Sequence, residues 1–314
     1  MKPVALTHYD TDFQRSSLKL LCKNFTIKFY TEGTTIPFDD VEVLFVSPLL
    51  FPWLGHELYR FPNLKVIASN TSETCHIALA EAEKRGIKVL TLSPLDTQTI
   101  TATAEHTLAL ILAAYRTIPT VCNKTPYRNW DRRLVPAPPK MLSRMTLGII
   151  GYGRLGKMLH ERTNKLFERV LHVDKMDEIL PILKHLDIVS LHVPLTPKTD
   201  GLVDSYFLRE LPIGSILVNT SRGEVVNIPD LLEALNTRRL RAAALDVLPG
   251  EFAEGFSSSW PKSAIAQYAA YYNNLILTPH VGGSTRDAWE ETEHLIIRKA
   301  VEAMKEIRTF KHGN

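Results

Sequence analysis

The chain has 314 residues, of which 45% are hydrophobic and 23% charged, a composition that excludes disordered, collagen-like and small disulfide-stabilised proteins and leaves room for two domains. Lysine and arginine number 37 against 34 aspartates and glutamates, and this net charge of +3 argues against a dedicated nucleic-acid surface. Cys22, Cys75 and Cys122 are widely spaced and the chain lacks a signal-peptide pattern or a long apolar run, so we expect a cytoplasmic protein with reduced thiols, no metal site and no membrane partner.

Short apolar runs alternate with longer amphipathic segments along the chain, the pattern of β-α units around a parallel sheet. In the first part, a helix is predicted over residues 76–85, because Gly86 suits the left-handed turn that follows a helix end. Strands are predicted there at residues 4–6, 25–29, 41–46, 66–68 and 88–90.

The middle of the chain combines the most apolar helix candidate with a proline-rich stretch. Residues 101–118 are too hydrophobic on all sides for a surface helix, so we expect them between domains or subunits. A long strand-free connection is predicted from the prolines that follow, which are Pro119, Pro126, Pro136, Pro138 and Pro139.

The alternation then restarts and continues to a closing helix. This helix is predicted from Ser284, where Asp287 completes a capping box, to about Ile307, and it returns to the first domain. Six buried runs precede it and fit a complete doubly wound sheet, at residues 147–150, 170–173, 188–193, 215–218, 242–245 and 275–277.

A glycine loop follows the first of these runs. Gly151, Gly153 and Gly156 stand between an apolar strand and a helical run over residues 155–167, where they suit a tight turn, the approach of a pyrophosphate, and close helix–strand packing. Asp174 lies eighteen residues past Gly156, at the end of the next strand, where a carboxylate binds both adenosine ribose hydroxyls and repels a 2′-phosphate. The pattern therefore favours NAD over NADP, although Lys175 weakens the preference slightly; the alternative is an ordinary strand–turn–helix loop beside an unrelated aspartate.

Three polar residues lie where later strands should end, the edge at which open α/β sheets bind ligands. Arg222 follows one apolar run, Glu251 lies five residues after the strand-end Asp246, and His280 follows the last run. Taken singly, each has an ordinary alternative as a salt-bridged arginine, an exposed loop glutamate or a structural histidine.

With these residues in place, the sequence resembles the D-isomer-specific 2-hydroxyacid dehydrogenase family, in particular its phosphoglycerate, glycerate and hydroxypyruvate-type members. The resemblance implies an α/β protein in which a doubly wound parallel-sheet (Rossmann) NAD-binding domain, residues 99–283, is joined to a smaller flavodoxin-like substrate domain, residues 1–98 and 284–314. The segments that carry the resemblance are residues 147–156, 192–202, 219–227, 244–247 and 278–285.

The resemblance also implies a role for each polar residue. Arg222 would bind the substrate carboxylate and carbonyl, His280 would be the acid–base group, and Glu251 would orient it. The chemistry asks for these residue types, because hydride transfer to a carbonyl carbon builds charge on its oxygen that an imidazolium neutralises with a proton, and because a guanidinium matches a carboxylate. Further cofactor contacts are implied at Arg154, Leu155, Val193, Pro194, Thr220, Ser221, Arg222, Asp246, His280 and Gly282; Asp246 could bond the carboxamide or cap a helix instead.

Two segments depart from the family pattern. Family members usually carry a glycine-containing loop that holds the substrate carboxylate, whereas here Asn70, Thr71 and Ser72 would bind it and the acidic Glu73 follows them. After Glu251 comes Phe252 rather than the usual proline, and the stretch over residues 252–274 is longer than usual. That insertion could be a lid, a dimer contact or a tolerated surface loop.

We therefore expect an NAD-dependent oxidoreductase that interconverts a small D-2-hydroxy acid and its 2-oxo acid, with residues of both domains meeting at a cleft. The alternative is an NAD(H)-sensing binding protein of the corepressor type on the same fold. Formate dehydrogenases resemble the pattern with glutamine where Glu251 stands, so the glutamate argues against that branch. A homodimer is expected by resemblance, with the apolar helix over residues 101–118 near its interface.

Overall fold

The computed structural model describes residues 2–8, 14–30, 38–46, 58–72, 74, 76–127, 130–131, 138–253 and 255–310. The chain divides into two compact units. The first unit comprises Met1–Ile100, Phe252–Glu254 and Ser284–Asn314, and the second comprises Thr101–Glu251 and Gly255–Gly283. The division after Ile100 falls two residues later than the boundary predicted from the sequence. The short piece Phe252–Glu254 belongs to the first unit, whereas the sequence predicts it within the NAD-binding domain.

The first unit is built on one parallel sheet. Its described strands run in the order β2-β1-β3-β4-β5, the flavodoxin-like order. Every predicted strand is confirmed, with ends shifted by two residues or fewer. The strands are Val4–His8 (β1), Thr26–Tyr30 (β2), Val43–Val46 (β3), Val66–Ser69 (β4) and Lys88–Leu90 (β5).

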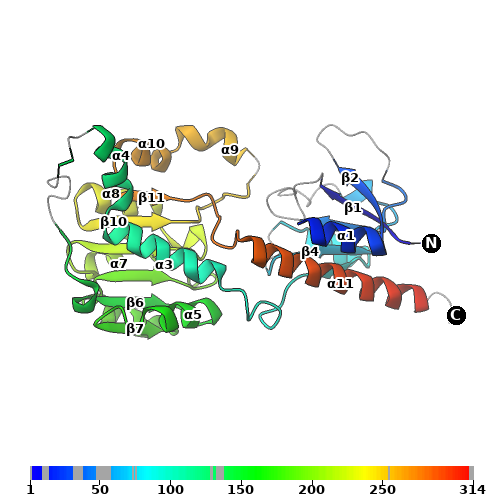
Figure 1. Cartoon of the computed structure of the whole chain (residues 1–314), viewed down its shortest axis with the longest axis horizontal. Coiled ribbons are helices and arrows are strands. Elements are labelled where there is room, and N and C mark those ends of the chain that lie inside the picture. The colour runs from blue at the N-terminus through cyan, green and yellow to red at the C-terminus, as the bar shows by residue number, and fades with distance from the viewer. Residues whose placement is uncertain are drawn as a thin grey trace. The chain divides into compact units, whose positions relative to one another are not determined.

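Helices cover this sheet, and one of them comes from the far end of the chain. On one face, α11 (Arg286–Phe310) lies beside α1 (Arg15–Asn24), as Figure 1 shows. Its buried Ile296 and Ile297 pack with Phe25, Phe45 and Val66. The predicted return of the closing helix to the first domain is thus explained by its apolar stripe.

The ends of two predicted helices need correction. The helix α2 (Leu79–Lys84) begins later than expected, because the buried His76 lies in a turn where its Nε2 is 3.0 Å from Ser69 Oγ. At the start of α11, Thr285 Oγ1 accepts the N–H of Ala288 at 3.3 Å. The cap is therefore Thr285, and the predicted capping box of Ser284 with Asp287 is wrong by one residue.

An ion pair joins α11 to the turn that follows β5 in the first unit. Lys299 Nζ donates to the Asp96 carboxylate, which also accepts the N–H of Ser93 at 2.6 Å. The hydrogen bond from Lys299 holds the pKa of Asp96 down at about 2. Asp96 therefore stays charged in the folded chain at pH values where the unfolded chain protonates it, and its stabilisation is complete above about pH 4 and lost as the pH falls toward 2.

Lys299→Met is expected to remove most of this pH-dependent stabilisation. Urea unfolding midpoints at pH 7 and pH 3 should differ less in the variant than in the wild type, because the Asp96 pKa would return toward its ordinary value. Lys305→Met, on an exposed position of the same helix, is the matched control. Equal pH dependence in the wild type and Lys299→Met would show that the pair contributes nothing.

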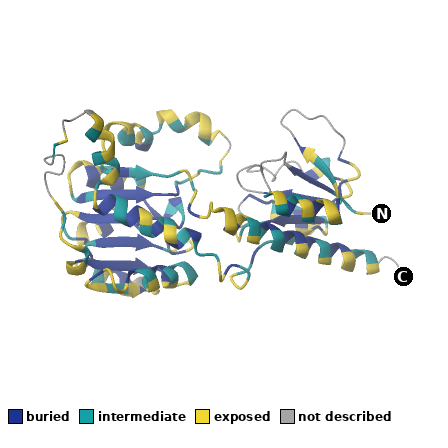
Figure 2. Ribbon diagram, viewed as in Figure 1, coloured by how far each residue is buried: buried dark blue, intermediate teal, exposed yellow. Residues whose placement is uncertain are grey.

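The second unit is built on a larger parallel sheet. Among its described residues, six strands run in the order β11-β10-β9-β8-β6-β7, and Figure 2 shows the strands as largely buried. The predicted doubly wound sheet is confirmed. Its strands are Thr146–Ile150 (β6), Arg169–Val173 (β7), Ile188–Leu191 (β8), Ser215–Asn219 (β9), Leu240–Leu245 (β10) and Leu275–Leu277 (β11).

Helices pack on both faces of this sheet. One face is covered by α3 (Ala102–Tyr115) and α5 (Arg154–Thr163), with Leu110, Ile111 and Leu159 in the shared core. The helices of the other face contribute Leu183, Phe207 and Leu231 to a second cluster. They are α6 (Ile179–Leu183), α7 (Ser205–Glu210), α8 (Ile228–Asn236) and α10 (Ala264–Tyr271).

The apolar helix and the proline-rich stretch differ from their predictions. The helix α3 ends at Tyr115, because Thr117 takes a left-handed conformation with φ of 50°. A new helix, α4 (Ile118–Lys124), then begins with Pro119 in its first turn, where the missing N–H costs nothing. The expected long connection therefore begins with a helix, while Pro136 lies outside the described residues.

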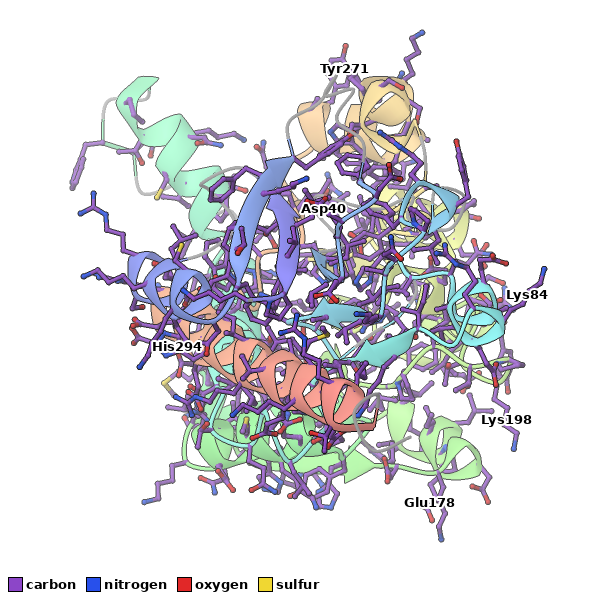
Figure 3. All side chains as sticks on the ribbon, turned by 90° about the vertical axis from the view of Figure 1, so that its right-hand side faces the viewer. Asp40, Lys84, Glu178, Lys198, Tyr271 and His294 are labelled. Atoms are coloured by element: carbon purple, nitrogen blue, oxygen red, sulfur yellow. The ribbon has the colours of Figure 1, made fainter. Side chains whose placement is uncertain are left out.

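The insertion after Glu251 is also more structured than a loop. It contains α9 (Phe256–Ser259) and α10, whose Ile265 is buried and whose Tyr268 packs on the core of the second unit. Figure 3 labels Tyr271 on α10, and this residue is 83% exposed. The surface-loop interpretation is wrong for this helix, and a lid or dimer contact stays a prediction.

Two further observations concern the expected class of protein. Cys22 and Cys122 are exposed free thiols, whereas Cys75 lies outside the described residues. None of the described helices has both the length and the apolar character that crossing a bilayer requires.

Candidate active site

The second unit has its topological switch point at β6. This strand pairs with β7 on one side and with β8 on the other, so the chain leaves it in opposite directions. In open α/β sheets, ligands bind in the crevice beyond the carboxyl ends of the strands at such a point. The predicted site residues of this unit follow β6, β7, β8, β9, β10 and β11 at this edge.

The three glycines that follow β6 differ in the space that a side chain would find at each position. Gly151 has φ of +95°, and a Cβ there would lie 2.5 Å from the carbonyl oxygen of His192. A Cβ on Gly156 would lie 2.2 Å from the carbonyl oxygen of Gly151, whereas one on Gly153 would meet nothing within 4 Å. Two glycines therefore shape the loop, and the middle one borders open space where a ligand can approach the backbone.

The loop leads into the N-terminus of α5. Gly153 precedes its first turn, so the N–H groups of Arg154 and Leu155 lack intrahelical acceptors and suit an anion. Burial lowers the pKa of the Arg154 guanidinium, which stays charged at neutral pH. Asp174 is exposed at the end of β7, and its Oδ1 accepts the N–H of Tyr152 at 3.0 Å. The set fits a dinucleotide, with amides for its phosphates and a carboxylate for a ribose.

A hydrogen-bonded turn after β9 presents Arg222. The Oδ1 of Asn219 accepts the N–H of Ser221 at 2.9 Å, and its Nδ2 donates to the carbonyl of Arg222 at 2.8 Å. The Arg222 guanidinium donates to the carbonyl of Ser221. A Cβ on Gly223 would lie 1.9 Å from the carbonyl carbon of Leu248, so the turn packs directly against the chain that leads to Glu251.

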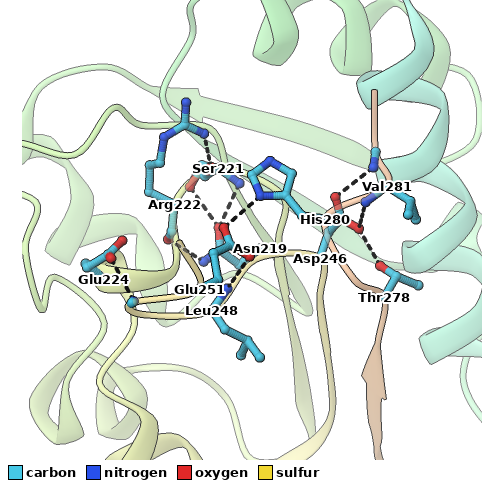
Figure 4. Close-up of polar contacts among 12 residues, drawn as sticks. Asn219, Ser221, Arg222, Glu224, Asp246, Leu248, Glu251, Thr278, His280 and Val281 are labelled. Carbon is cyan, nitrogen blue, oxygen red and sulfur yellow. Dashed lines mark hydrogen bonds and ion pairs between the residues drawn. The ribbon is translucent and has the colours of Figure 1, made fainter. Parts of the chain in front are cut away.

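His280 and Glu251 form a hydrogen-bonded pair. The two atoms joined, Nδ1 of His280 and Oε1 of Glu251, are 2.7 Å apart, and Figure 4 shows them together with Arg222. The Glu251 side chain is 14% exposed and that of His280 is 31% exposed, so the imidazole still reaches solvent on one side. His280 has φ of 51°, a conformation uncommon for residues other than glycine and typical of functional sites.

Asp246 holds the turn that carries His280. Its buried carboxylate accepts the hydroxyl of Thr278 at 2.6 Å and the N–H groups of Val281 and Gly282 at 3.0 and 2.8 Å. The Nε2 of His106, from α3, lies 3.3 Å from the same carboxylate. These bonds go to a loop, so the helix-capping alternative is wrong, and a cofactor contact of Asp246 stays a prediction.

Asp246→Asn is expected to destabilise the second unit by about 1–3 kcal/mol, because the amide nitrogen cannot accept the N–H groups that the carboxylate accepts. Turnover should fall as well, since the turn fixes His280. Chemical denaturation and steady-state rates check both effects, with the exposed Asp200→Asn as control. Unchanged stability and turnover in Asp246→Asn would contradict this role.

The other predicted residues follow β8 and β9 in the second unit and β4 in the first unit. Val193 is buried and Pro194 exposed after β8, and Thr220 Oγ1 is 2.8 Å from Thr107 Oγ1. Burial lowers the pKa of His192, which follows β8, to about 4, so this ring is neutral at neutral pH. The substrate-loop residues Asn70, Thr71 and Ser72 follow β4 in the first unit, and Glu73 lies outside the described residues.

Sequence reasoning missed some of the residues that hold the site. His106 lies in the apolar run of α3, and its Nε2 is 3.1 Å from Thr278 Oγ1, a residue 172 positions later. Nothing in the local pattern signals that contact. Asn219 was part of a motif without a role of its own, although an amide after a strand can bond its own turn.

Comparisons with known proteins agree with this geometry. The family model described as D-isomer specific 2-hydroxyacid dehydrogenase, NAD binding domain, matches residues 108–282. The chain belongs to the D-isomer specific 2-hydroxyacid dehydrogenase family. It is an NAD-dependent dehydrogenase, and NAD is its cofactor.

Curated relatives and solved structures of this family cover most of the dehydrogenase chain. A glycerate dehydrogenase from Methylorubrum extorquens is 31% identical over 272 residues, 82% of this chain and 83% of that protein. A glyoxylate reductase from Thermofilum pendens is 31% identical, over 78% of this chain and 73% of its own. A D-lactate dehydrogenase from Aquifex aeolicus, solved with NAD and lactic acid, has the same fold, with a TM-score of 0.78 at 24% identity over 99% of this chain and 98% of that chain.

Proposed function

We propose that this dehydrogenase interconverts a small D-2-hydroxy acid and its 2-oxo acid, with His280 as acid and base. The observation that carries the proposal is the 2.7 Å hydrogen bond between His280 Nδ1 and Glu251 Oε1, at the sheet edge that also holds the dinucleotide motif. A carboxylate at Nδ1 fixes the tautomer of the ring and stabilises its charged form. That pairing leaves Nε2 as the atom that exchanges a proton with substrate.

His280 moves one proton per turnover. When bound, the nicotinamide supplies or accepts the hydride at the substrate carbon. In the direction of reduction, the imidazolium Nε2 gives its proton to the carbonyl oxygen as negative charge builds there, and in oxidation the neutral ring takes the hydroxyl proton. The carboxylate of Glu251, 2.7 Å from Nδ1, lowers the free energy of the imidazolium in both directions.

Arg222 binds and orients the substrate. Its guanidinium has five N–H donors in a planar fork, which matches a carboxylate in two-point contact. The turn of Asn219 and Ser221 fixes the backbone from which Arg222 projects. We assign it the substrate carboxylate and the carbonyl oxygen, because its charge also favours electron density on that oxygen.

Asn70, Thr71 and Ser72 are proposed as the substrate-binding segment of the first unit. Thr71 Oγ1 is 2.9 Å from Ser69 Oγ, which the buried His76 also contacts, so the segment has a hydrogen-bonded base. Side-chain hydroxyls and an amide would take the place of backbone amides in holding a carboxylate. The relatives named glycerate dehydrogenase and glyoxylate reductase make hydroxypyruvate and glyoxylate the first candidates.

The experiment is a substrate panel. The purified protein with NADH and each of glyoxylate, hydroxypyruvate, pyruvate and a branched 2-oxo acid should consume NADH with at least one of them. In the reverse direction it should oxidise the D but not the L enantiomer of the matching hydroxy acid. Tight NADH binding without turnover of any 2-oxo acid would overturn the proposal in favour of an NAD(H)-sensing protein.

We also propose that the protein acts as a homodimer in the cytoplasm. Leu108 and Leu112 of α3 are only partly buried within the chain, which supports the expectation that this helix lies near an interface. Analytical ultracentrifugation should give twice the chain mass of 35.5 kDa. A monomer at micromolar concentration would refute the dimer.

A further inference from the structure

Three aromatic rings gather behind the glycine loop of the second unit. Tyr152, the second residue of that loop, stacks on His172 of β7, with ring centroids 3.6 Å apart and planes inclined by 16°. The Tyr152 hydroxyl lies 2.7 Å from Nδ1 of His160 on α5, and the two imidazoles are 5.4 Å apart. One side chain therefore joins the loop to both elements that flank it.

The backbone of the same residue holds Asp174. The N–H of Tyr152 donates to Asp174 Oδ1 at 3.0 Å, and the preceding N–H of Gly151 donates to Val173 at 2.8 Å. His172 lies in β7, and Asp174 follows directly after Val173, the last residue of that strand. Stacking on His172 and the hydroxyl contact with His160 therefore restrain the residue whose amide orients the carboxylate.

This anchoring matters because Asp174 is exposed and directly follows the edge strand β7. An exposed aspartate samples several rotamers, and fixing it in the complex costs side-chain entropy. The hydrogen bond from the Tyr152 N–H favours one rotamer of Asp174 before the cofactor binds. Lys157, whose Nζ lies 5.9 Å from the centre of the Tyr152 ring, adds a favourable cation–π contact on this side chain.

We propose that Tyr152, held by His160 and His172, is a positioning residue that sets Asp174 and the glycine loop for the adenosine half of NAD. Two properties then depend on it. The first is affinity for the adenosine half, because the carboxylate is oriented in advance. The second is discrimination against NADP, because a fixed carboxylate repels a 2′-phosphate more strongly than one that can turn away.

The test is direct binding by isothermal titration with NADH, NADPH and ADP-ribose. Tyr152→Ala should weaken NADH and ADP-ribose by the same factor, about tenfold or 1.4 kcal/mol, while NADPH weakens less, so that the preference for NADH shrinks by about threefold or more. Tyr152→Phe keeps the stacked ring and loses only the hydroxyl bond to His160, so it should restore most of both properties. Tyr206→Ala removes a half-exposed tyrosine of α7 and is the matched surface control.

A second variant tests the proposal even if Tyr152→Ala does not fold. His172→Leu deletes the stacking partner on an exposed position of an edge strand and should also reduce the preference for NADH. An equal loss of NADH and NADPH affinity in both variants would show a merely structural role and overturn the proposal. Wild-type affinities for both cofactors in both variants would overturn it as well.

Discussion

Replacing His280 by alanine is expected to lower the turnover of a 2-oxo acid by a factor of about 10² to 10⁴. The imidazole is the proposed proton donor, and the variant removes the ring whose Nδ1 lies 2.7 Å from Glu251 Oε1. NADH binding should be retained, because the dinucleotide motif lies after β6 and β7 rather than on the turn of His280. Rapid-mixing measurement of NADH consumption, beside an NADH titration, separates the two effects.

Glu251→Gln serves as the graded companion of this variant. It keeps the size of the side chain and an acceptor for Nδ1 but removes the charge. The loss of turnover should therefore be smaller than in His280→Ala, and it should be largest for reduction of the oxo acid, which uses the imidazolium. His185→Ala, on an exposed position of the second unit, is the control. Full activity in His280→Ala would refute the assignment, whereas loss of NADH binding in that variant would show that His280 acts on the cofactor site.

Gly156→Ala is expected to lower the stability of the protein, whereas Gly153→Ala is expected to lower its affinity for NADH. At Gly156 the new methyl group would lie 2.2 Å from the carbonyl oxygen of Gly151, so the loop must shift and the free protein should lose about 1–3 kcal/mol of stability. At Gly153 the methyl group meets nothing within 4 Å and the backbone has φ of −72°. That variant should keep its stability and bind NADH more weakly, because the methyl group occupies the side that a pyrophosphate approaches.

Thermal unfolding without cofactor and NADH titration distinguish the two cases. A stable Gly156→Ala would contradict the packing argument, because the contact is with backbone that cannot rotate away. Undiminished NADH affinity in Gly153→Ala would mean that the pyrophosphate does not approach the loop at this residue. The pair thereby tests the cofactor site without depending on which 2-oxo acid is the substrate.

Local sequence was sufficient for most elements. Continuous apolar runs predict buried parallel strands, and every predicted strand was found with its ends within two residues of the predicted ends. Helix ends were harder, as α2, α3 and α11 show. Their ends depend on a buried histidine at position 76, a left-handed Thr117 and the hydroxyl of Thr285, which are tertiary or backbone features that hydrophobic periodicity does not carry.

The insertion over residues 252–274 shows the same limit at the level of packing. The sequence left a lid, a dimer contact and a surface loop open for it, whereas in the structure Ile265 and Tyr268 pack on the apolar core of the second unit. Whether a short amphipathic segment folds depends on such a surface being present, because isolated short helices are marginal in water.

The sequence by itself determined the family, the cofactor motif and the residue types of the chemistry, because these depend on spacing along one strand–turn–helix unit and on strand ends that a parallel sheet brings to one edge. Only the tertiary structure decided that Asp246 holds the turn of His280, that His106 reaches that turn from α3, and that Tyr152 is fixed between His160 and His172. Contacts of this kind join side chains distant in sequence, and their energy arises from hydrogen-bond geometry and burial that exist only after the strands and helices have packed.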